Sequence, residues 1–200
     1  MSSLFADDAV IRRVGREGVL VLGGGRALLM QLAHPSVARA VADHSDFQSD
    51  PLARLRATLE ATFTIVFGTD EDASRVAAAV RAVHDRVNGA DYEANDPALL
   101  CWVNATLTDT AMRVYRDYVR PLGDTDAARY YEESTRIAEV LGCPRDQQPA
   151  DLAEFRAYMR EMVDELVVSD PARRMGHSVL HPRLPLVAGP PLALFRFVTV

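Results

Sequence analysis

Apolar residues recur at intervals of three and four along most of the chain, which is the spacing of an amphipathic α-helix. This pattern predicts helices over residues 6–18, 26–33, 51–67, 69 or 70 to about 87, 96 to about 118, 124–141, 150–168 and 170–180. No segment alternates apolar and polar positions for long enough to predict a strand. We therefore expect an all-α protein, with residues 1–200 forming a single globular domain of many helices.

Proline, glycine and short polar residues mark the ends of these helices. Pro35 has no N–H to donate to the preceding turn, so one helix should end near His34 and another should begin at Pro35. Asp50 is the expected N-cap of the helix that follows it, and Gly68 should end that helix. Asp96 stands at the same kind of position before the helix that ends near residue 118.

Composition and charge narrow the class of protein. Hydrophobic residues make up 48% of the 200 positions and charged residues 25%, which supports a buried core. The formal net charge of −6 argues against non-specific nucleic-acid binding, which needs a cationic surface. Arginine supplies all 22 basic side chains and lysine is absent, so no side-chain amine can form a Schiff base.

The N-terminal region and the cysteines bear on the compartment. Asp7 and Asp8 precede any basic residue, which does not fit a secretory signal. The apolar run over residues 18–22 is far shorter than the ~20 residues of a spanning helix. Cys101 and Cys143 form no C-x-x-C motif and are expected either as free core thiols or as a pair. We expect a cytoplasmic protein without stable membrane insertion.

Three glycines follow an apolar run, which invites a dinucleotide-binding interpretation. The fingerprint G-x-G-x-x-G requires glycine at its sixth position, and Leu28 stands there when the count begins at Gly23. No pattern of parallel strands follows. We therefore expect the glycines at 23–25 to allow close contact between helices or with a flat ligand.

Two kinds of metal site receive little support from the histidines. Di-iron bundles use Glu-x-x-His on two helices, and no histidine here has an acidic residue three positions before it. His177 and His181 are four apart and could face one metal, but Pro182 follows and no third ligand stands at a set spacing. Two polar residues at a helix end are the simpler interpretation. His44, also at a helix exit, needs only a capping role.

The spacing of Arg81, His84 and Asn88 is more informative, because residues three and four apart share one face of a helix. A histidine among apolar neighbours is by default a satisfied core residue. An arginine one turn away must find an anion. A non-covalent haem requires an axial nitrogen and a cation for its propionates, so the pair also fits a haem site. Arg54 and Thr58, with Thr62, form a similar stripe one helix earlier that is by itself ordinary amphipathic surface.

Longer motifs occur in a fixed order from about Val14 onwards. They are Gly25-Arg-Ala-Leu-Leu-Met-Gln-Leu-Ala-His34-Pro35, Asp50-Pro51 with Arg54-Leu-Arg-Ala-Thr58-Leu, Val66-Phe-Gly68, Arg81-x-x-His84, Asp96-Pro97-x-Leu-Leu-x-Trp102-Val103, Ala105-Thr-Leu107 and Tyr130-Tyr-Glu-Glu133. This set resembles the catalytic-domain family of rubber oxygenases (latex-clearing proteins) and MpaB-type oxygenases.

The resemblance implies a helical fold around a buried pocket for haem b, with oxygen and a small hydrophobic substrate as reactants. By this resemblance His84 is the iron ligand, Arg81 neutralises a propionate, and Arg54 and Thr58 line the distal side. His34 is a candidate for the pocket wall or for proton delivery. Family domains usually continue beyond the point where this chain stops, so a further C-terminal extension is expected.

Departures from the family pattern leave alternatives open. Family members often carry arginine and histidine where this chain has Asn88 and Asn104, and latex-clearing members can carry a distal lysine where it has Ala57. One alternative is a member that kept the fold and lost the haem. Another is a non-catalytic helical module that binds a ligand or partner through the apolar residues 190–200. Homo-oligomerisation is compatible with the sequence.

Overall fold

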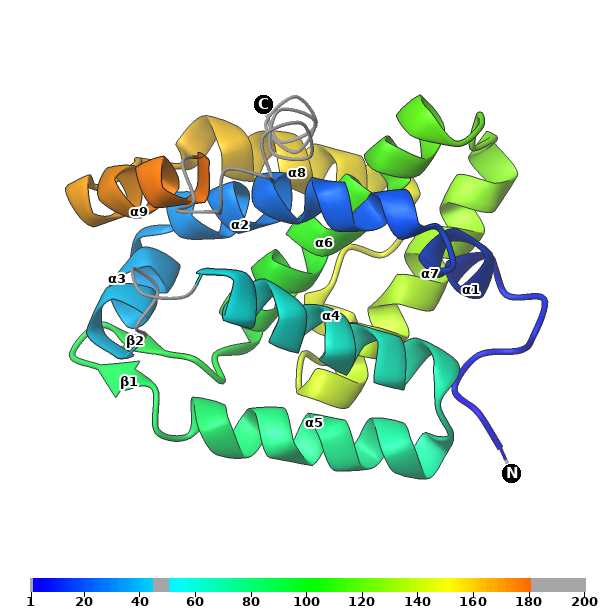
Figure 1. Cartoon of the computed structure of the whole chain (residues 1–200), viewed down its shortest axis with the longest axis horizontal. Helices are drawn as coiled ribbons and strands as arrows, with labels where there is room; N and C mark the ends of the chain where they lie inside the picture. Colours follow the sequence, from blue (N-terminus) through cyan, green and yellow to red (C-terminus); the bar gives the residue numbers. More distant parts are fainter. Residues whose placement is uncertain (1, 45–50, 181–200) are drawn as a thin grey trace, which may run out of the picture.

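Helices make up nearly all the regular structure of the chain (Figure 1), which confirms the all-α prediction. The computed structural model describes residues 2–44 and 51–180, and the side chains of all of these except 51–55. The α-helices are α1 Val10–Gly15, α2 Gly24–Ala33, α3 Pro35–His44, α4 Pro51–Phe67, α5 Asp70–His84, α6 Pro97–Tyr118, α7 Asp124–Leu141, α8 Leu152–Glu165 and α9 Asp170–Leu180. Two 3₁₀ helices, η1 Gly18–Gly23 and η2 Arg145–Gln147, and two short strands, β1 Asn88–Gly89 and β2 Tyr92–Glu93, complete the described elements.

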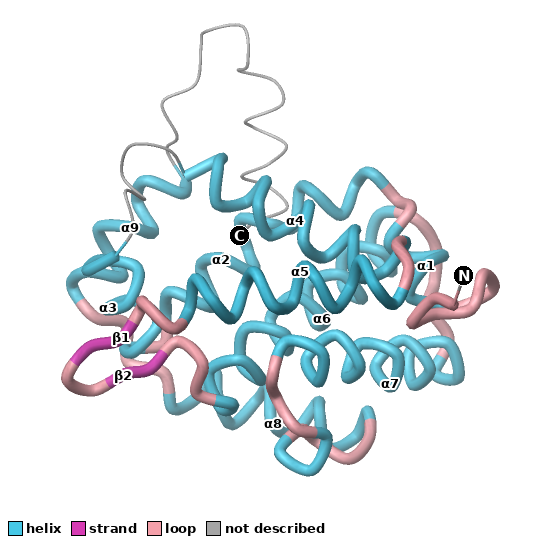
Figure 2. Tube along the Cα trace, turned by 90° about the horizontal axis from the view of Figure 1, so that it is seen from below, coloured by secondary structure: helices cyan, strands magenta, loops and turns pink. Residues whose placement is uncertain are grey.

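The long helix α6 runs through the centre of the fold and contacts α2 on one side and α7 on another (Figures 1 and 2). Trp102 of α6 is fully buried in a cluster that also contains Leu32, Phe155 and Met175. A second cluster joins α1 to the turn between α4 and α5 and includes Val14. A third, smaller cluster joins Leu100 and Cys101 of α6 to Ala138 and Cys143, so the described core forms three apolar regions around α6.

The helix predicted over residues 6–18 is wrong in its extent, because α1 covers only Val10–Gly15. Glu133 of α7 accepts a hydrogen bond from the backbone N–H of Ile11 at 2.7 Å and thereby satisfies the start of α1. Buried Arg12 bonds back to Asp7 and Ser3, which holds the preceding residues against the helix. Contacts distant in sequence thus set the first boundary of α1.

The glycine-rich segment lies in η1 and the start of α2 rather than in a strand and turn, and it packs on α6. A Cβ atom on Gly23 would lie 2.7 Å from Cγ2 of Thr110 and 2.8 Å from Cγ2 of Val114. This agrees with the prediction that these glycines permit close contact between helices.

Most other boundaries follow local signals. Thr69 and Asp72 form a capping box that starts α5, and the Asp96 side chain accepts from the Ala98 N–H to start α6. α2 ends at Ala33, and His34 takes an extended conformation, as the following proline requires. The predicted cap at Asp50 and the apolar residues 190–200 lie outside the described residues.

Among the described residues, no helix is both long enough and apolar enough to cross a membrane.

Candidate functional site

The helices α4 and α5 form an antiparallel hairpin, because a short turn through Gly68 and Thr69 joins them (Figure 1). Arg54 lies 13 residues before Phe67, and His84 lies 14 residues after Asp70. At a rise of 1.5 Å per residue, each stands about 20 Å from the turn. The far end of the hairpin therefore brings Arg54 level with His84, a relation that is not visible in the linear sequence.

Packing is tight near the turn of this hairpin. Ile65, Val66, Ala73 and Ala77 are at most 3% exposed. Thr58 on α4, and Arg81 and His84 on α5, are only partly buried. Among the described residues, the core clusters take no member of α5 beyond Val76. The far half of α5 thus carries polar side chains beside the core rather than members of these clusters.

His84 is the last residue of α5 and lies on the face that this helix turns toward the protein. It follows Ala77 by seven positions, which is two helical turns, and Ala77 is buried. Its Nδ1 atom is shielded from solvent. In contrast, Val83 beside it in the sequence is 51% exposed and points to the opposite side. His84 therefore stands on the partly buried face of α5, and its role as an iron ligand stays a prediction.

Arg81 lies one turn before His84 on the same face and has a structural partner. Its Nη1 donates to the backbone carbonyl oxygen of Val140, at 2.6 Å, in the last turn of α7. This bond caps a carbonyl that has no partner within its own helix, next to Gly142 in the left-handed conformation (φ 115°). A guanidinium has five N–H donors, so Arg81 retains capacity for an anion beside this bond.

Asn88 does not share this face, and the prediction that residues 81, 84 and 88 form one stripe is wrong for Asn88. α5 ends at His84, and Asn88 stands in β1, exposed to solvent. Its side chain donates to the carbonyl oxygen of Asp85, and its own carbonyl oxygen contacts Nε2 of His44 at 3.3 Å. The strand pair is held against α3 by Tyr92, whose hydroxyl donates to Asp43. These contacts require the chain to leave the helix before residue 88.

His34 lies at the end of α2, close to the charge of Asp96. Burial lowers the pKa of His34, and the negative charge of Asp96 opposes this effect. Its Nδ1 is buried and has no hydrogen-bond partner among the residues that the structure describes. A half-buried imidazole that favours its neutral form can accept a proton, which is the property a proton-transfer residue needs.

Asn95 links the end of α5 to the segment beside His34, and no sequence pattern pointed to it. Its Nδ2 donates to Oδ1 of Asp85 at 2.6 Å and to the carbonyl oxygen of Arg81 at 3.3 Å. Because Asp96 follows it directly, one short segment reaches both the end of α5 and His34. Asn95 therefore positions the last turn of α5, and only its position before an N-cap aspartate could have drawn attention to it.

Thr58 stands on α4 at the far half of the hairpin, and its carbonyl oxygen accepts from the Thr62 hydroxyl at 2.8 Å. Arg54 belongs to the same helix, but its side chain lies outside the described set. Within the described ranges, no group of three or more histidine, cysteine or acidic residues could hold a metal ion by itself. Cys101 and Cys143 are free and buried, which confirms one of the two expectations for the cysteines.

A family model described as "ER-bound oxygenase mpaB/B'/Rubber oxygenase, catalytic domain" matches residues 11–200. The chain belongs to this family. All the candidate residues on α2, α4 and α5 lie within the matched region. The family of oxygenase catalytic domains expected from the ordered motifs is thus confirmed.

Two curated mycobacterial proteins are also similar to this family member. Uncharacterized proteins from Mycobacterium bovis and from Mycobacterium tuberculosis are each 30% identical to it over 155 residues, which cover 73% of this chain and 61% of theirs. The chain thus matches about three fifths of the length of these relatives. No solved structure matches it.

Proposed function

We propose that this family member is a haem b-dependent oxygenase that uses O₂ to oxidise a small hydrophobic substrate. His84 would supply the nitrogen ligand to the haem iron, Arg81 would pair with a propionate, and Arg54 and Thr58 would line the side where O₂ and substrate bind. The observation that supports this most is that Arg54 of α4 and the partly buried His84 of α5 stand at the same level, at the far end of the α4–α5 hairpin.

The donor set fits a haem. A five-coordinate haem takes one protein ligand to iron, and His84 is a half-buried imidazole facing inward. Arg81 has donors beyond the one that bonds Val140. Asn88 does not fit, because it stands outside the helix on an exposed strand, so we assign it no contact with the cofactor. A second cation for the propionates is therefore not identified on α5.

Each side chain has a separate task in this proposal. Bound haem supplies redox-active iron at which O₂ can react. His84 would hold that iron, and Asn95 keeps the last turn of α5 in place. Thr58 can donate a hydrogen bond on the distal side, and no lysine exists in the chain to compete for that position. His34, favoured in its neutral form, can take up a proton near Asp96.

A haem titration tests the proposal directly. The full chain is purified, supplemented with haem b, and assayed by its visible spectrum and by the pyridine haemochrome method. We expect about one haem per chain and a Soret band that His84→Ala abolishes. His44→Ala is the matched control, because His44 ends α3 and touches the strand pair rather than the hairpin. It should bind haem like the wild type.

The outcomes separate the proposal from its alternatives. A chain that stays colourless after supplementation favours a family member that kept the fold without its cofactor. A Soret band of equal intensity in His84→Ala and the wild type contradicts the assignment of the ligand. Consumption of O₂ by the haem-loaded protein with an electron donor and a hydrophobic alkene then tests oxygenase activity itself.

A further inference from the structure

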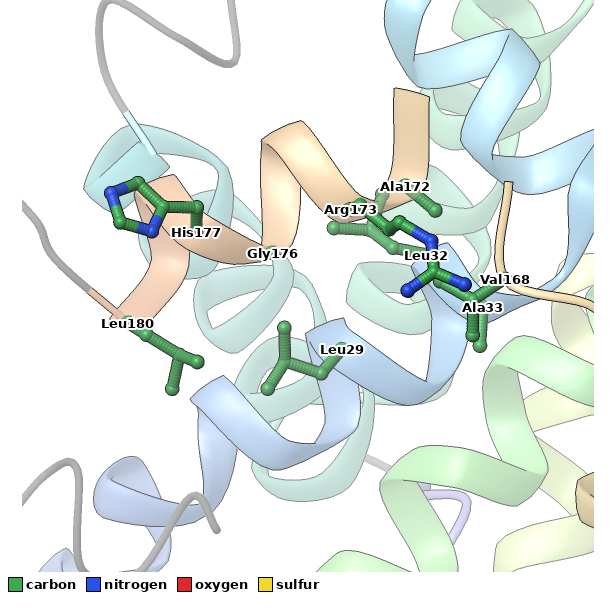
Figure 3. A pocket seen from close by; sticks show the side chains of 9 residues that line it. All are labelled: Leu29, Leu32, Ala33, Val168, Ala172, Arg173, Gly176, His177 and Leu180. Atoms are coloured by element: carbon green, nitrogen blue, oxygen red, sulfur yellow. The ribbon is translucent and has the colours of Figure 1, made fainter. Parts of the chain in front are cut away.

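A pocket of about 410 Å³ lies between α2 and α9 (Figure 3), and none of the described residues that line it belongs to the α4–α5 hairpin. This volume falls in the range of small-molecule sites. Its walls are mostly apolar, and the residues that line it are Leu29, Leu32, Ala33, Val168, Ala172, Arg173, Gly176, His177 and Leu180. Space for the pocket depends on Gly176, since a Cβ atom there would already lie 3.3 Å from Cδ2 of Leu29.

Among the described residues that line the pocket, the polar side chains are those of Arg173 and His177, both on α9. Arg173 extends its guanidinium along the wall toward Val168 and Leu32, whereas the ring of His177 is turned outward at the other end (Figure 3). No ion pair joins the Arg173 side chain to any residue that the structure describes. A permanent positive charge beside apolar walls attracts a ligand that is anionic at one end and apolar along its length.

We infer that this pocket is a second binding site, for a medium-chain carboxylate whose alkyl tail lies against α2 and whose head group pairs with Arg173. A single guanidinium matches a carboxylate, which it can bind through two parallel hydrogen bonds. The leucine and alanine side chains of α2 exclude water from the alkyl chain. The site does not depend on the haem proposal, because none of the described residues that line it belongs to the hairpin.

Calorimetric titration of the full chain with decanoate, below its micellar concentration and at pH 7.5, tests the inference. We expect saturable binding of one decanoate per chain. Arg173→Gln should weaken it about threefold, the loss expected for one ion pair at a solvent-exposed rim. Decanol, which has the tail without the charge, should bind the wild type about as weakly as decanoate binds Arg173→Gln.

Three variants control for unrelated effects. Arg174→Gln removes the same charge from the next position of α9, which does not line the pocket, and should bind decanoate like the wild type. Gly176→Val fills the space in front of Leu29 and should abolish binding of both ligands. Ala33→Leu narrows the pocket from α2 and replaces Gly176→Val if circular dichroism shows that the latter is unfolded.

Several results would overturn the inference. Absence of saturable binding to the full chain would mean that another segment or a second copy fills the pocket. Equal affinities for decanoate and decanol, unchanged in Arg173→Gln, would show that no anion is recognised. Unaltered binding to a folded pocket-filling variant would place the ligand elsewhere. Because His84→Ala should bind decanoate like the wild type, failure of the haem proposal leaves this inference intact.

Discussion

Replacing Gly23 by alanine isolates the close contact between η1 and α6. Gly23 has φ −73° and ψ −13°, a conformation that alanine adopts without strain. The added methyl group is therefore the only perturbation, and it would stand 2.7 Å from Cγ2 of Thr110 and 2.8 Å from Cγ2 of Val114. Gly18, in the same 3₁₀ helix, would carry an added methyl group with no atom within 4 Å and serves as the matched control.

The magnitude follows from this overlap. Carbon atoms in contact prefer about 3.5–4.0 Å, so the methyl group intrudes by roughly 0.7–1.3 Å on two side chains. Thr110 and Val114 are β-branched residues in the middle of α6, and their χ1 angles have little freedom to adjust. Overpacking of this kind costs about 1–3 kcal/mol. For a chain of this size we expect the melting temperature to fall by about 2–12 °C.

Thermal unfolding followed by circular dichroism measures the effect, with Gly18→Ala expected within about 0.5 kcal/mol of the wild type. A double-mutant cycle with Thr110→Ser sharpens the test. Serine removes the Cγ2 methyl group but keeps the hydroxyl that accepts from Nη1 of Arg26 at 2.7 Å. The double variant should recover part of the loss. The reasoning is refuted if Gly23→Ala has the same melting temperature as Gly18→Ala. It is also refuted if adding Thr110→Ser recovers none of the stability that Gly23→Ala loses.

Three further predictions concern polar side chains of α5 and of the segments next to it. Asn95→Ala removes the side-chain hydrogen bonds to the last turn of α5. It should lower the free energy of unfolding by about 1–2 kcal/mol in a denaturant titration, and it should also lower the haem content. An unchanged denaturation midpoint would contradict the positioning role of Asn95. Hydrogen bonds from the backbone and side chain of Thr69, then from Arg75, lower the pKa of Asp72. The stabilisation from the Asp72 carboxylate is therefore present above its unfolded pKa of about 3.9. The free energy of unfolding of the wild type should exceed that of Asp72→Asn at pH 6, and the two should converge as pH falls below about 4. Burial lowers the pKa of His34, so protonation of His34 opposes folding as pH falls below about 6.5. The variant His34→Gln should therefore lose less stability than the wild type between pH 7 and 5. If the two proteins lose stability in parallel over this range, the pKa of His34 is not lowered.

The candidate site shows how far sequence patterns reach. The spacing of Arg81 and His84 correctly predicted that they share one face of a helix, because both lie within the regular part of α5. The same spacing failed at Asn88, because the helix ends at His84 and the chain then turns into β1. The bond from Tyr92 to Asp43 and the ion pair between Arg39 and Asp91 fix this exit. Both bonds join segments about 50 residues apart, so no local pattern contains them.

Long-range contacts also decide the roles of individual side chains. Arg81 caps the end of α7 through Val140, and Asn95 holds the end of α5. Buried Arg12 donates to the carbonyl oxygen of Val66, 54 positions away. Periodicity places such a residue on a face of its helix, but its partner depends on which helix packs there.

The sequence alone determined the helical class, most helix boundaries and the family, because capping residues, prolines and the 3.6-residue period act within a few positions of one another. Only the tertiary structure decided that the far end of α4 stands level with His84, that Gly23 meets α6, and that a pocket opens between α2 and α9. The physical reason is that packing joins residues by complementary shape and by bonds to distant carbonyl and carboxylate oxygens, and neither is encoded in a local pattern.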